Sequence, residues 1–342
     1  MDTLFDKSDF VLCDIPVPQG YPQSQTHCTA VLYKESVFLV TSPYPSVRLS
    51  FIRLVIRYII RKISFGFLFK NTRGEYYENP CIYVSVASDE YPPRKFQLMQ
   101  SRPLIETPDN YYGLPSFNSD PNLNIDNNQL VILNRTTYRK DDGYENRLYL
   151  IKGKDDCGRF RLDSISMFKE GQIPFVSPCI IIYKDKYLFT YLDTNCYNDG
   201  KSYDGLYMIY SDRLDDLRNN NNWNRVDVIS GDYLPWHMSL FVYNSKLYSI
   251  VTCIKKGYPQ RGYLMLGAFS EDLQILSIYP KPLSNYNSYR SSAFVDEKGT
   301  FVLYNATLRE KIKGGRSVDG REIVVAQMPF VEVIAKVNSI EG

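Results

Sequence analysis

The sequence has little of what several functional classes need: two histidines, two tryptophans and a formal net charge of only +2 in 342 residues. The nearly balanced charge argues against the strongly basic surface of a nucleic-acid-binding protein, so no nucleic-acid partner is expected. No uncharged apolar run approaches the ~18 residues that a membrane span needs, so no membrane span is expected. The first residues, Met-Asp-Thr-Leu-Phe-Asp-Lys, show no basic segment followed by an apolar one. We therefore expect no secretory signal and a cytoplasmic or virion-associated protein.

Common catalytic and cofactor motifs are also missing. The chain has no P-loop, no G-x-G-x-x-G, no H-E-x-x-H and no G-x-S-x-G, so no cofactor is expected. The seven cysteines are scattered without a C-x-x-C, which argues against a disulfide framework and a zinc site, and no metal is expected. Four cysteines lie inside apolar runs, where a cysteine acts as a small buried hydrophobe. This pattern favours a reducing compartment.

A hairpin pattern recurs along the chain. Ser177–Asp193, SPCIIIYKDKYLFTYLD, places two runs of β-branched and aromatic residues around a short charged turn, which predicts a β-hairpin. Similar segments begin at Thr26, Ser119, Trp236 and Tyr289. Five copies of one strand-rich unit predict a β-propeller with five blades.

The spacing of these hairpins sets the expected blades. Asp120 and Pro178 are 58 residues apart, and Pro178 and His237 are 59 apart, somewhat above the ~40–50 residues of common propeller repeats. We therefore expect an all-β fold in which residues 1–342 form a single five-bladed β-propeller. The expected blades are about 20–100, 115–167, 175–230, 236–280 and 289–335, and the strand at 9–15 is expected to close the ring.

Residues 47–69 form an expected helical insertion in the first blade. Arg53, Arg57 and Arg61 recur every four residues between isoleucines and valines, a spacing that suits an amphipathic helix with a basic stripe. The even positions from 52 to 60 are also apolar, which would fit a strand. A helix of this kind could dock a protein partner, a second copy of the chain or an anionic surface. It could equally pack against the propeller with its arginines in solvent.

The starts of the predicted blades carry the candidate site. In a propeller the first strand of each blade lines the central channel, and sites form where such loops converge. Both histidines of the chain, His27 and His237, stand at blade starts, as do Asp120, Tyr289 and Arg290. Each histidine could be held by backbone carbonyls, or could be a ligand-facing donor or a general acid/base.

Four segments resemble the five-bladed propeller glycosidases, the arabinanase, β-xylosidase and invertase-like group: SDPNLNIDNNQLVIL, SPCIIIYKDKYLFTY, PWHMSLFVYNSKLY and SYRSSAFVDEKGTFVLYNA. The first blade matches only loosely. That family uses an aspartate on each of the first two blades and a glutamate in a Ser-Pro-Glu motif on the third. Asp120 matches the second-blade aspartate, whereas Cys179 stands at the acid position and His27 near the first aspartate.

The resemblance implies a carbohydrate ligand and an altered catalytic set. Glycoside hydrolysis needs two carboxyl groups, about 5–5.5 Å or 6.5–9.5 Å apart, with one protonated and one ionised. Glu78 and Asp204 lie at turn–strand junctions and are the substitutes for the missing acid, and Asp120 with Glu78 is the predicted catalytic pair. The predicted ligand-binding residues offer ring faces and hydrogen bonds to a sugar: Trp236, Tyr289, Tyr111, Tyr112, His27, His237 and Arg290.

Two functions follow from this reading. The first is a carbohydrate-engaging propeller that resembles glycoside hydrolases and is weakly active, divergent or binding-only. The second is a structural propeller, for example a bacteriophage tail or virion component, docked through residues 47–69. A fold by itself hosts both kinds of function and does not choose between them.

Overall fold

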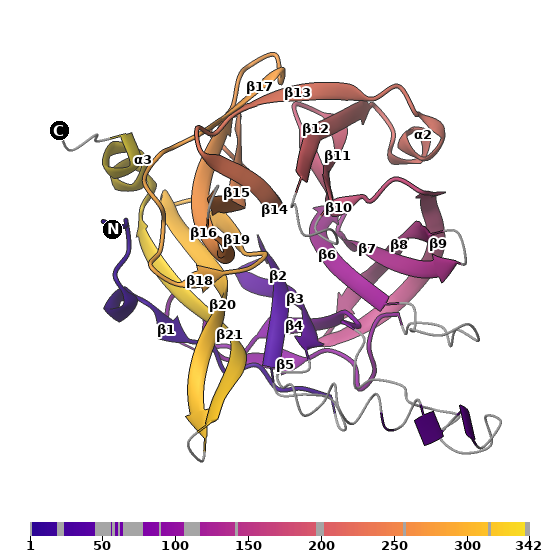
Figure 1. Ribbon diagram of the computed structural model, residues 1–342, viewed down its shortest axis with the longest axis horizontal. Helices are drawn as coiled ribbons and strands as arrows, with labels where there is room; N and C mark the ends of the chain where they lie inside the picture. Colours follow the sequence, from indigo (N-terminus) through magenta and orange to yellow (C-terminus); the bar gives the residue numbers. More distant parts are fainter. Residues whose placement is uncertain are drawn as a thin grey trace.

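The computed structural model describes residues 2–18, 24–44, 56, 59–60, 62–63, 78–88, 90–105, 117–140, 143–195, 202–255, 258–313 and 316–338. Within these ranges nearly all regular structure is β-strand (Figure 1). The strands form two four-stranded sheets, one five-stranded sheet and one eight-stranded sheet. The prediction of an all-β chain is therefore confirmed.

The two four-stranded sheets are antiparallel and follow the chain in order. The first contains β2 (Ser24–Tyr33), β3 (Ser36–Tyr44), β4 (Cys81–Ser85) and β5 (Phe96–Leu98). The second contains β6 (Phe117–Asp126), β7 (Gln129–Lys140), β8 (Gly143–Asp156) and β9 (Arg159–Gly171).

The eight-stranded sheet consists of two antiparallel groups of four. The first comprises β10 (Val176–Tyr183), β11 (Lys186–Asn195), β12 (Ser202–Ser211) and β13 (Asn224–Ile229). The second comprises β14 (Tyr233–Tyr243), β15 (Lys246–Lys255), β16 (Tyr258–Phe269) and β17 (Ile275–Ile278). The outer strands β13 and β17 pair in parallel and so join the two groups.

The last sheet brings both ends of the chain together. It contains β18 (Asn287–Ser288), β19 (Ser292–Val295), β20 (Thr300–Lys313) and β21 (Arg316–Pro329), with the short β1 (Val11–Leu12) alongside β21. Val11 lies opposite Val325, and Leu12 opposite Val324. Thus the N-terminal segment completes a sheet that the C-terminal hairpin begins.

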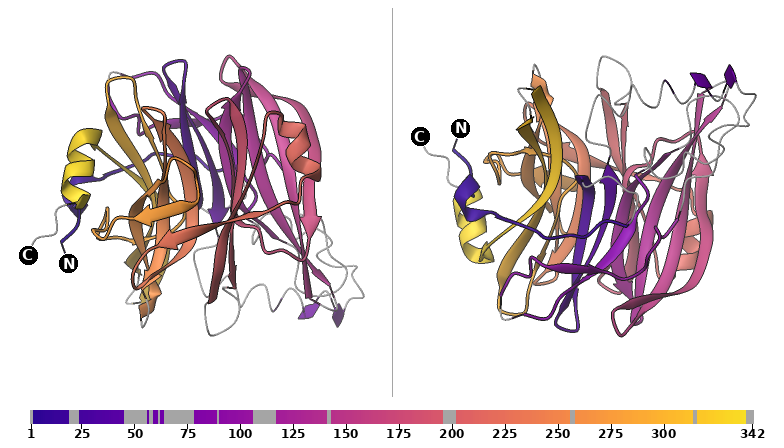
Figure 2. Two further views of the ribbon diagram at one scale, coloured as in Figure 1. Left: turned by 90° about the horizontal axis from the view of Figure 1, so that it is seen from above. Right: turned by 90° about the horizontal axis from the view of Figure 1, so that it is seen from below.

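The innermost strands of these five groups form a closed circle of neighbours. β2 contacts β6, β6 contacts β10, β10 contacts β14, β14 contacts β19, and β19 contacts β2 again. Figures 1 and 2 show the groups arranged around a common axis. In the described chain, five apolar clusters each lie between two adjacent groups. The core is therefore distributed between faces of neighbouring sheets, as the alternation of buried side chains on twisted strands requires.

Four of the inner hairpins turn in the same way. The turn residues 34–35, 127–128, 184–185 and 244–245 all have positive φ, the signature of type I′ turns, whose twist matches that of the flanking strands. Lys-Glu and Lys-Asp are unusual sequences for such turns, which favour asparagine and glycine. The apolar runs on both sides override that local preference by fixing the hairpin register.

The C-terminal segment differs from the sequence-based expectation. Residues 330–335 were expected to belong to the last blade, but Phe330–Asn338 form helix α3. Pro329 ends β21, and Phe330, Val333 and Val337 bury one helical face. Spacing of three and four residues favours a helix over a strand. Two other helices have described bounds: a 3-10 turn, η1 (Lys7–Asp9), and α2 (Leu214–Asn219).

Most of segment 47–69 lies outside the described residues, including Arg53, Arg57 and Arg61. The described positions 56, 59, 60, 62 and 63 are helical. Across the part of the chain that the structure describes, no helix is long and apolar enough to cross a membrane.

Candidate active site

Three innermost strands share a local irregularity that aims side chains at the centre of the circle. Two residues in each strand, 27–28 in β2, 120–121 in β6 and 177–178 in β10, are skipped in the pairing register. The first residue of each pair has a left-handed backbone, with φ of 54° at His27, 52° at Asp120 and 49° at Ser177. Such bulges re-aim side chains beside active sites. A non-glycine residue held in this conformation costs about 1–3 kcal/mol and persists where the surroundings enforce it.

Asp120 lies at the centre of a buried polar cluster and is 0% exposed. Its Oδ2 is 2.6 Å from Nη2 of Arg135. Its Oδ1 is 3.1 Å from Nδ1 of His27, 3.2 Å from Nδ1 of His237 and 4.0 Å from Nη1 of Arg290. Burial alone would raise the pKa of Asp120, but the charge of Arg135 and the neighbouring His27 and His237 hold it well below its ordinary value. Asp120 is therefore a fixed negative charge.

His27 lies between two carboxylates. Nδ1 faces Asp120, and Nε2 contacts the carboxylate of Glu78. Burial lowers the pKa of His27, but the charges of Glu78 and Asp120 outweigh that effect and raise it overall. Glu78 is the more accessible of the two acids, with a side chain 14% exposed against 0% for Asp120. The three side chains thus connect the buried centre to a partly exposed carboxylate.

His237 is the neutral member of the cluster. Burial lowers the pKa of His237 to about 4, despite the opposing effect of Asp120. Its Nδ1 is hydrogen-bonded to Ser177 Oγ at 2.9 Å, whereas its Nε2 has no hydrogen-bond partner among the described residues. Ser177 and Asp120 face the same ring nitrogen, so these residues are not a Ser-His-Asp triad, in which serine and aspartate lie at opposite nitrogens.

Arg290 is a further buried member of the cluster. The side chain is 0% exposed, so it faces the cluster and not an open channel. Its Nη2 donates to the carbonyl oxygen of Pro178 at 3.1 Å and lies 3.3 Å from Sγ of Cys179. Burial raises the pKa of Cys179, although Arg290 opposes the shift. Cys179 is therefore a buried thiol in contact with a guanidinium group.

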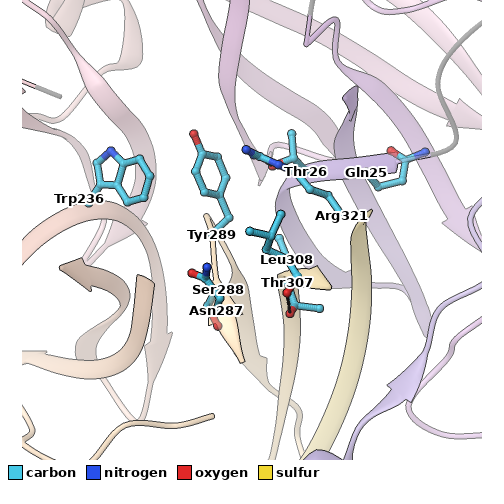
Figure 3. Close-up of a pocket in the computed structure, with 10 residues that line it drawn as sticks. Gln25, Thr26, Trp236, Asn287, Ser288, Tyr289, Thr307, Leu308 and Arg321 are labelled. Carbon is cyan, nitrogen blue, oxygen red and sulfur yellow. Dashed lines mark hydrogen bonds between the residues drawn. The ribbon is translucent and has the colours of Figure 1, made fainter. Parts of the chain in front are cut away.

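An aromatic wall separates the cluster from an adjoining pocket. The Tyr289 ring centre lies 4.9 Å from that of His27, 4.4 Å from His237 and 5.1 Å from Trp236. The Arg321 guanidinium lies 4.6 Å from the same ring on the other side (Figure 3). The pocket has a volume of about 200 Å³ and is lined by Trp236, Tyr289, Arg321, Gln25, Thr26, Asn287, Ser288, Ala306, Thr307 and Leu308.

The structure brings together seven of the residues that the sequence singled out: His27, Glu78, Asp120, Trp236, His237, Tyr289 and Arg290. Tyr111 and Tyr112 lie outside the described residues. Asp204 is exposed, and its carbonyl oxygen accepts a hydrogen bond from Arg225. It is not one of the acids found around His27.

Sequence reasoning missed Arg135 and Arg321. Arg135 lies opposite Ser119 in the β6–β7 register, so a correct hairpin register would have placed it beside Asp120. Arg321 comes from the last hairpin, and its Nη1 donates to Thr26 Oγ1 from the first sheet. No local pattern signals that contact, because the two residues meet only when the circle closes.

Gly262 on β16 supports the pocket wall by close packing. A Cβ atom at this position would lie 2.0 Å from the carbonyl oxygen of Ser288 and 3.0 Å from Cγ2 of Thr252. Gly262→Ala is therefore expected to displace the segment before Tyr289 and to lower the free energy of unfolding by about 1–3 kcal/mol, as overpacking does. Urea unfolding measures this, with the exposed Ser164→Ala as control. Equal stability of the two variants would contradict the close packing.

His27, Asp120 and His237 could also hold a metal ion, since one ligand atom from each lies within 4.8 Å of the others. All three residues are buried. The neighbouring Arg135 and Arg290 cannot act as ligands, because guanidinium groups carry no free lone pair at neutral pH.

No family model and no curated protein matches the chain. Among solved structures, an N-acetylgalactosamine deacetylase from F. plautii, in complex with blood group B trisaccharide, gives a TM-score of 0.64 at 15% identity, over 95% of this chain and 97% of that chain. A mannose phosphorylase from Leishmania mexicana, in complex with phosphate ion, gives 0.54 at 11%, over 97% and 91%. A xylan β-1,4-xylosidase from Bacillus halodurans C-125 gives 0.53 at 11%, over 91% of this chain and 54% of that chain.

These likenesses concern the fold, because the identities are low. The chain spans about half the length of the xylosidase and nearly all of the deacetylase. The expected glycosidase-like propeller fold is thus confirmed, and the fold is one that several carbohydrate-active enzymes share.

Proposed function

We propose that the protein is a five-bladed β-propeller that hydrolyses a carbohydrate at the cluster around Asp120. In this reading each group of four strands is one blade, and β1 closes the ring beside β21. The circle of contacts between β2, β6, β10, β14 and β19 supports five blades. The shared fold with a deacetylase and a xylosidase supports a substrate of this class.

The proposal depends on one observation: a buried ionic cluster shares an aromatic wall with an adjoining pocket. Trp236 and Tyr289 line that pocket, and aromatic rings of this kind offer apolar faces with polar edges to a ligand. The volume, about 200 Å³, is below the ~300 Å³ at which pockets for drug-sized ligands begin. A single sugar unit of a longer chain is therefore the ligand that the pocket suits.

Within the cluster, Glu78 and Asp120 take different roles. Asp120 has both oxygens directed at cationic or imidazole groups and no exposed surface, so it positions His27 and His237. Glu78 is partly exposed and contacts the far nitrogen of His27. We assign Glu78 the proton transfer with the substrate, because a general acid or base must reach the reacting atoms.

Hydrolysis by the wild-type chain is the expected result on a panel of aryl glycosides, polysaccharides and N-acetylated sugars. Glu78→Gln keeps the size of the side chain and removes its carboxylate, so the initial rate should fall at least about 100-fold, the lower end for loss of a general acid or base. Glu297→Gln, at an exposed turn, is the matched control and should keep the wild-type rate. A Glu78→Gln variant that hydrolyses as fast as this control would remove the assignment.

One observation supports the alternative function, a structural propeller that docks through residues 47–69. Ile56, Ile59 and Ile63 are 50%, 49% and 73% exposed, so the described part of segment 47–69 presents an apolar surface of the kind that docks partners. Deleting residues 47–69 should leave a folded monomer that no longer assembles, measured by light scattering with size exclusion. A deletion variant that assembles like the full chain would contradict docking through this segment.

A further inference from the structure

We propose that His27, Asp120 and His237 bind one divalent transition-metal ion, although the sequence alone predicts no metal. The proposed ion would lie in the cluster to which the proposed function assigns hydrolysis. Only its role in that reaction rests on the proposed function. The ligand atoms are Nδ1 of His27, Oδ1 of Asp120 and Nδ1 of His237. Each comes from the start of a different blade.

The spacing of these atoms fits a shared ion. Two adjacent ligands bound about 2.0–2.2 Å from one metal lie about 2.8–3.1 Å from each other in octahedral geometry and about 3.3–3.6 Å in tetrahedral geometry. Oδ1 of Asp120 is 3.1 Å from the His27 nitrogen and 3.2 Å from the His237 nitrogen. Both separations therefore fall in the range for adjacent ligands of one ion.

The hydrogen bonding of these atoms points to a missing partner. Nδ1 of His27 and Oδ1 of Asp120 are buried and close together, yet neither has a hydrogen-bond partner of good geometry among the described residues. Buried polar atoms in folded proteins are nearly always satisfied, and an exception calls for a water or an ion. An ion between the two atoms would satisfy both.

The surrounding groups orient the proposed ligands. Glu78 contacts Nε2 of His27, which leaves Nδ1 to face the ion, and this carboxylate–histidine arrangement is common around bound metals. Arg135 occupies Oδ2 of Asp120 and leaves Oδ1 free for the ion. Ser177 Oγ is hydrogen-bonded to Nδ1 of His237, so metal binding requires this hydroxyl to turn away or to become a ligand.

The donor set selects the class of metal. Two imidazoles and one carboxylate suit zinc, iron, cobalt, nickel or manganese and leave positions open for water or substrate. Calcium and magnesium prefer oxygen ligands throughout. The carboxylates of Asp120 and Glu78 balance the guanidinium groups of Arg135 and Arg290, so the charge of the ion favours an anionic further ligand such as hydroxide. A bound ion would activate water for hydrolysis.

Metal binding is tested without substrate. The full chain is stripped with a chelator, dialysed, and titrated with Zn²⁺, Mn²⁺ or Ca²⁺ by calorimetry, with metal content measured by mass spectrometry. We expect one Zn²⁺ or Mn²⁺ per chain, weak or no binding of Ca²⁺, and loss of the site in the His27→Gln/His237→Gln double variant. Glu78→Gln should bind about 10–100-fold more weakly, the usual effect of losing an outer partner, whereas Glu297→Gln should bind normally.

Two outcomes would overturn the proposal. Wild-type protein that takes up no stoichiometric transition metal has no such site, and this measurement does not depend on a variant that folds. Binding that is unchanged in the double variant places the ion elsewhere. The proposed function fails separately: stoichiometric metal without hydrolysis of any sugar keeps the metal site and removes the hydrolase, and hydrolysis by metal-free protein does the reverse.

Discussion

Replacing Asp120 with asparagine is expected to abolish hydrolysis and to lower the free energy of unfolding by about 3–5 kcal/mol, the cost of removing one partner from a buried ion pair. Arg135 would lose the carboxylate 2.6 Å from its guanidinium, and Arg290 would lose the carboxylate 4.0 Å from its own. Asparagine tolerates a left-handed backbone, so the φ of 52° at this position is not the source of the effect. The substitution keeps the size of the side chain and removes its charge and one acceptor oxygen.

Urea unfolding followed by circular dichroism measures the stability of Asp120→Asn, and the sugar panel measures its activity. Asp227→Asn is the matched control, because Asp227 is exposed on β13, where substitutions usually change stability by less than about 0.5 kcal/mol. If Asp120→Asn is as stable as Asp227→Asn, the buried cluster does not hold the inner strands together. Hydrolysis that survives the change would exclude Asp120 from the reaction centre.

The second large effect is expected far from the site, at Phe330. Its ring lies 5.1 Å from those of Tyr243 and Tyr248 and 5.6 Å from that of Phe301. Phe330→Ala should lower the free energy of unfolding by about 3–5 kcal/mol, the usual cost of a cavity left by a buried phenylalanine. The neighbouring Val331→Ala, at a side chain 72% exposed, should have an effect below about 0.5 kcal/mol.

Comparing the two variants by urea unfolding tests whether α3 is part of the core. Phe330 packs on strands of the fourth and fifth groups, so its loss weakens the contact between them. A Phe330→Ala variant no less stable than Val331→Ala would mean that α3 does not contribute to the fold.

The sequence predicted the strands well, because their signal is local. Alternation of β-branched and aromatic residues around short turns marked the hairpins of β10–β11 and β14–β15. The end of the chain was harder, since the apolar run up to Val337 fits a strand or a helix until Pro329 is given its weight as a strand end. Burial of Phe330, Val333 and Val337 decided for the helix.

The sequence predicted that His27, Asp120 and His237 would lie close together, but it did not predict their contacts. The blade starts identified His27, Asp120 and His237 because equivalent positions converge in a ring. Their contacts depend on β-bulges with a left-handed backbone at His27 and Asp120. The sequence does not signal these bulges, because neither residue is a glycine, the residue type that usually marks such a backbone. The three proposed ligands are also far apart in the sequence, so no short motif could reveal them.

The most direct test of the central claim is a glycan array probed with the wild-type chain and with Trp236→Ala. We predict that the wild type binds at least one class of glycan. Trp236→Ala, shown to be folded by circular dichroism, should lose that binding because it lacks part of the aromatic wall of the pocket. Wild-type protein that binds no glycan, or glycan binding that is unchanged in Trp236→Ala, would contradict a sugar site beside the Asp120 cluster.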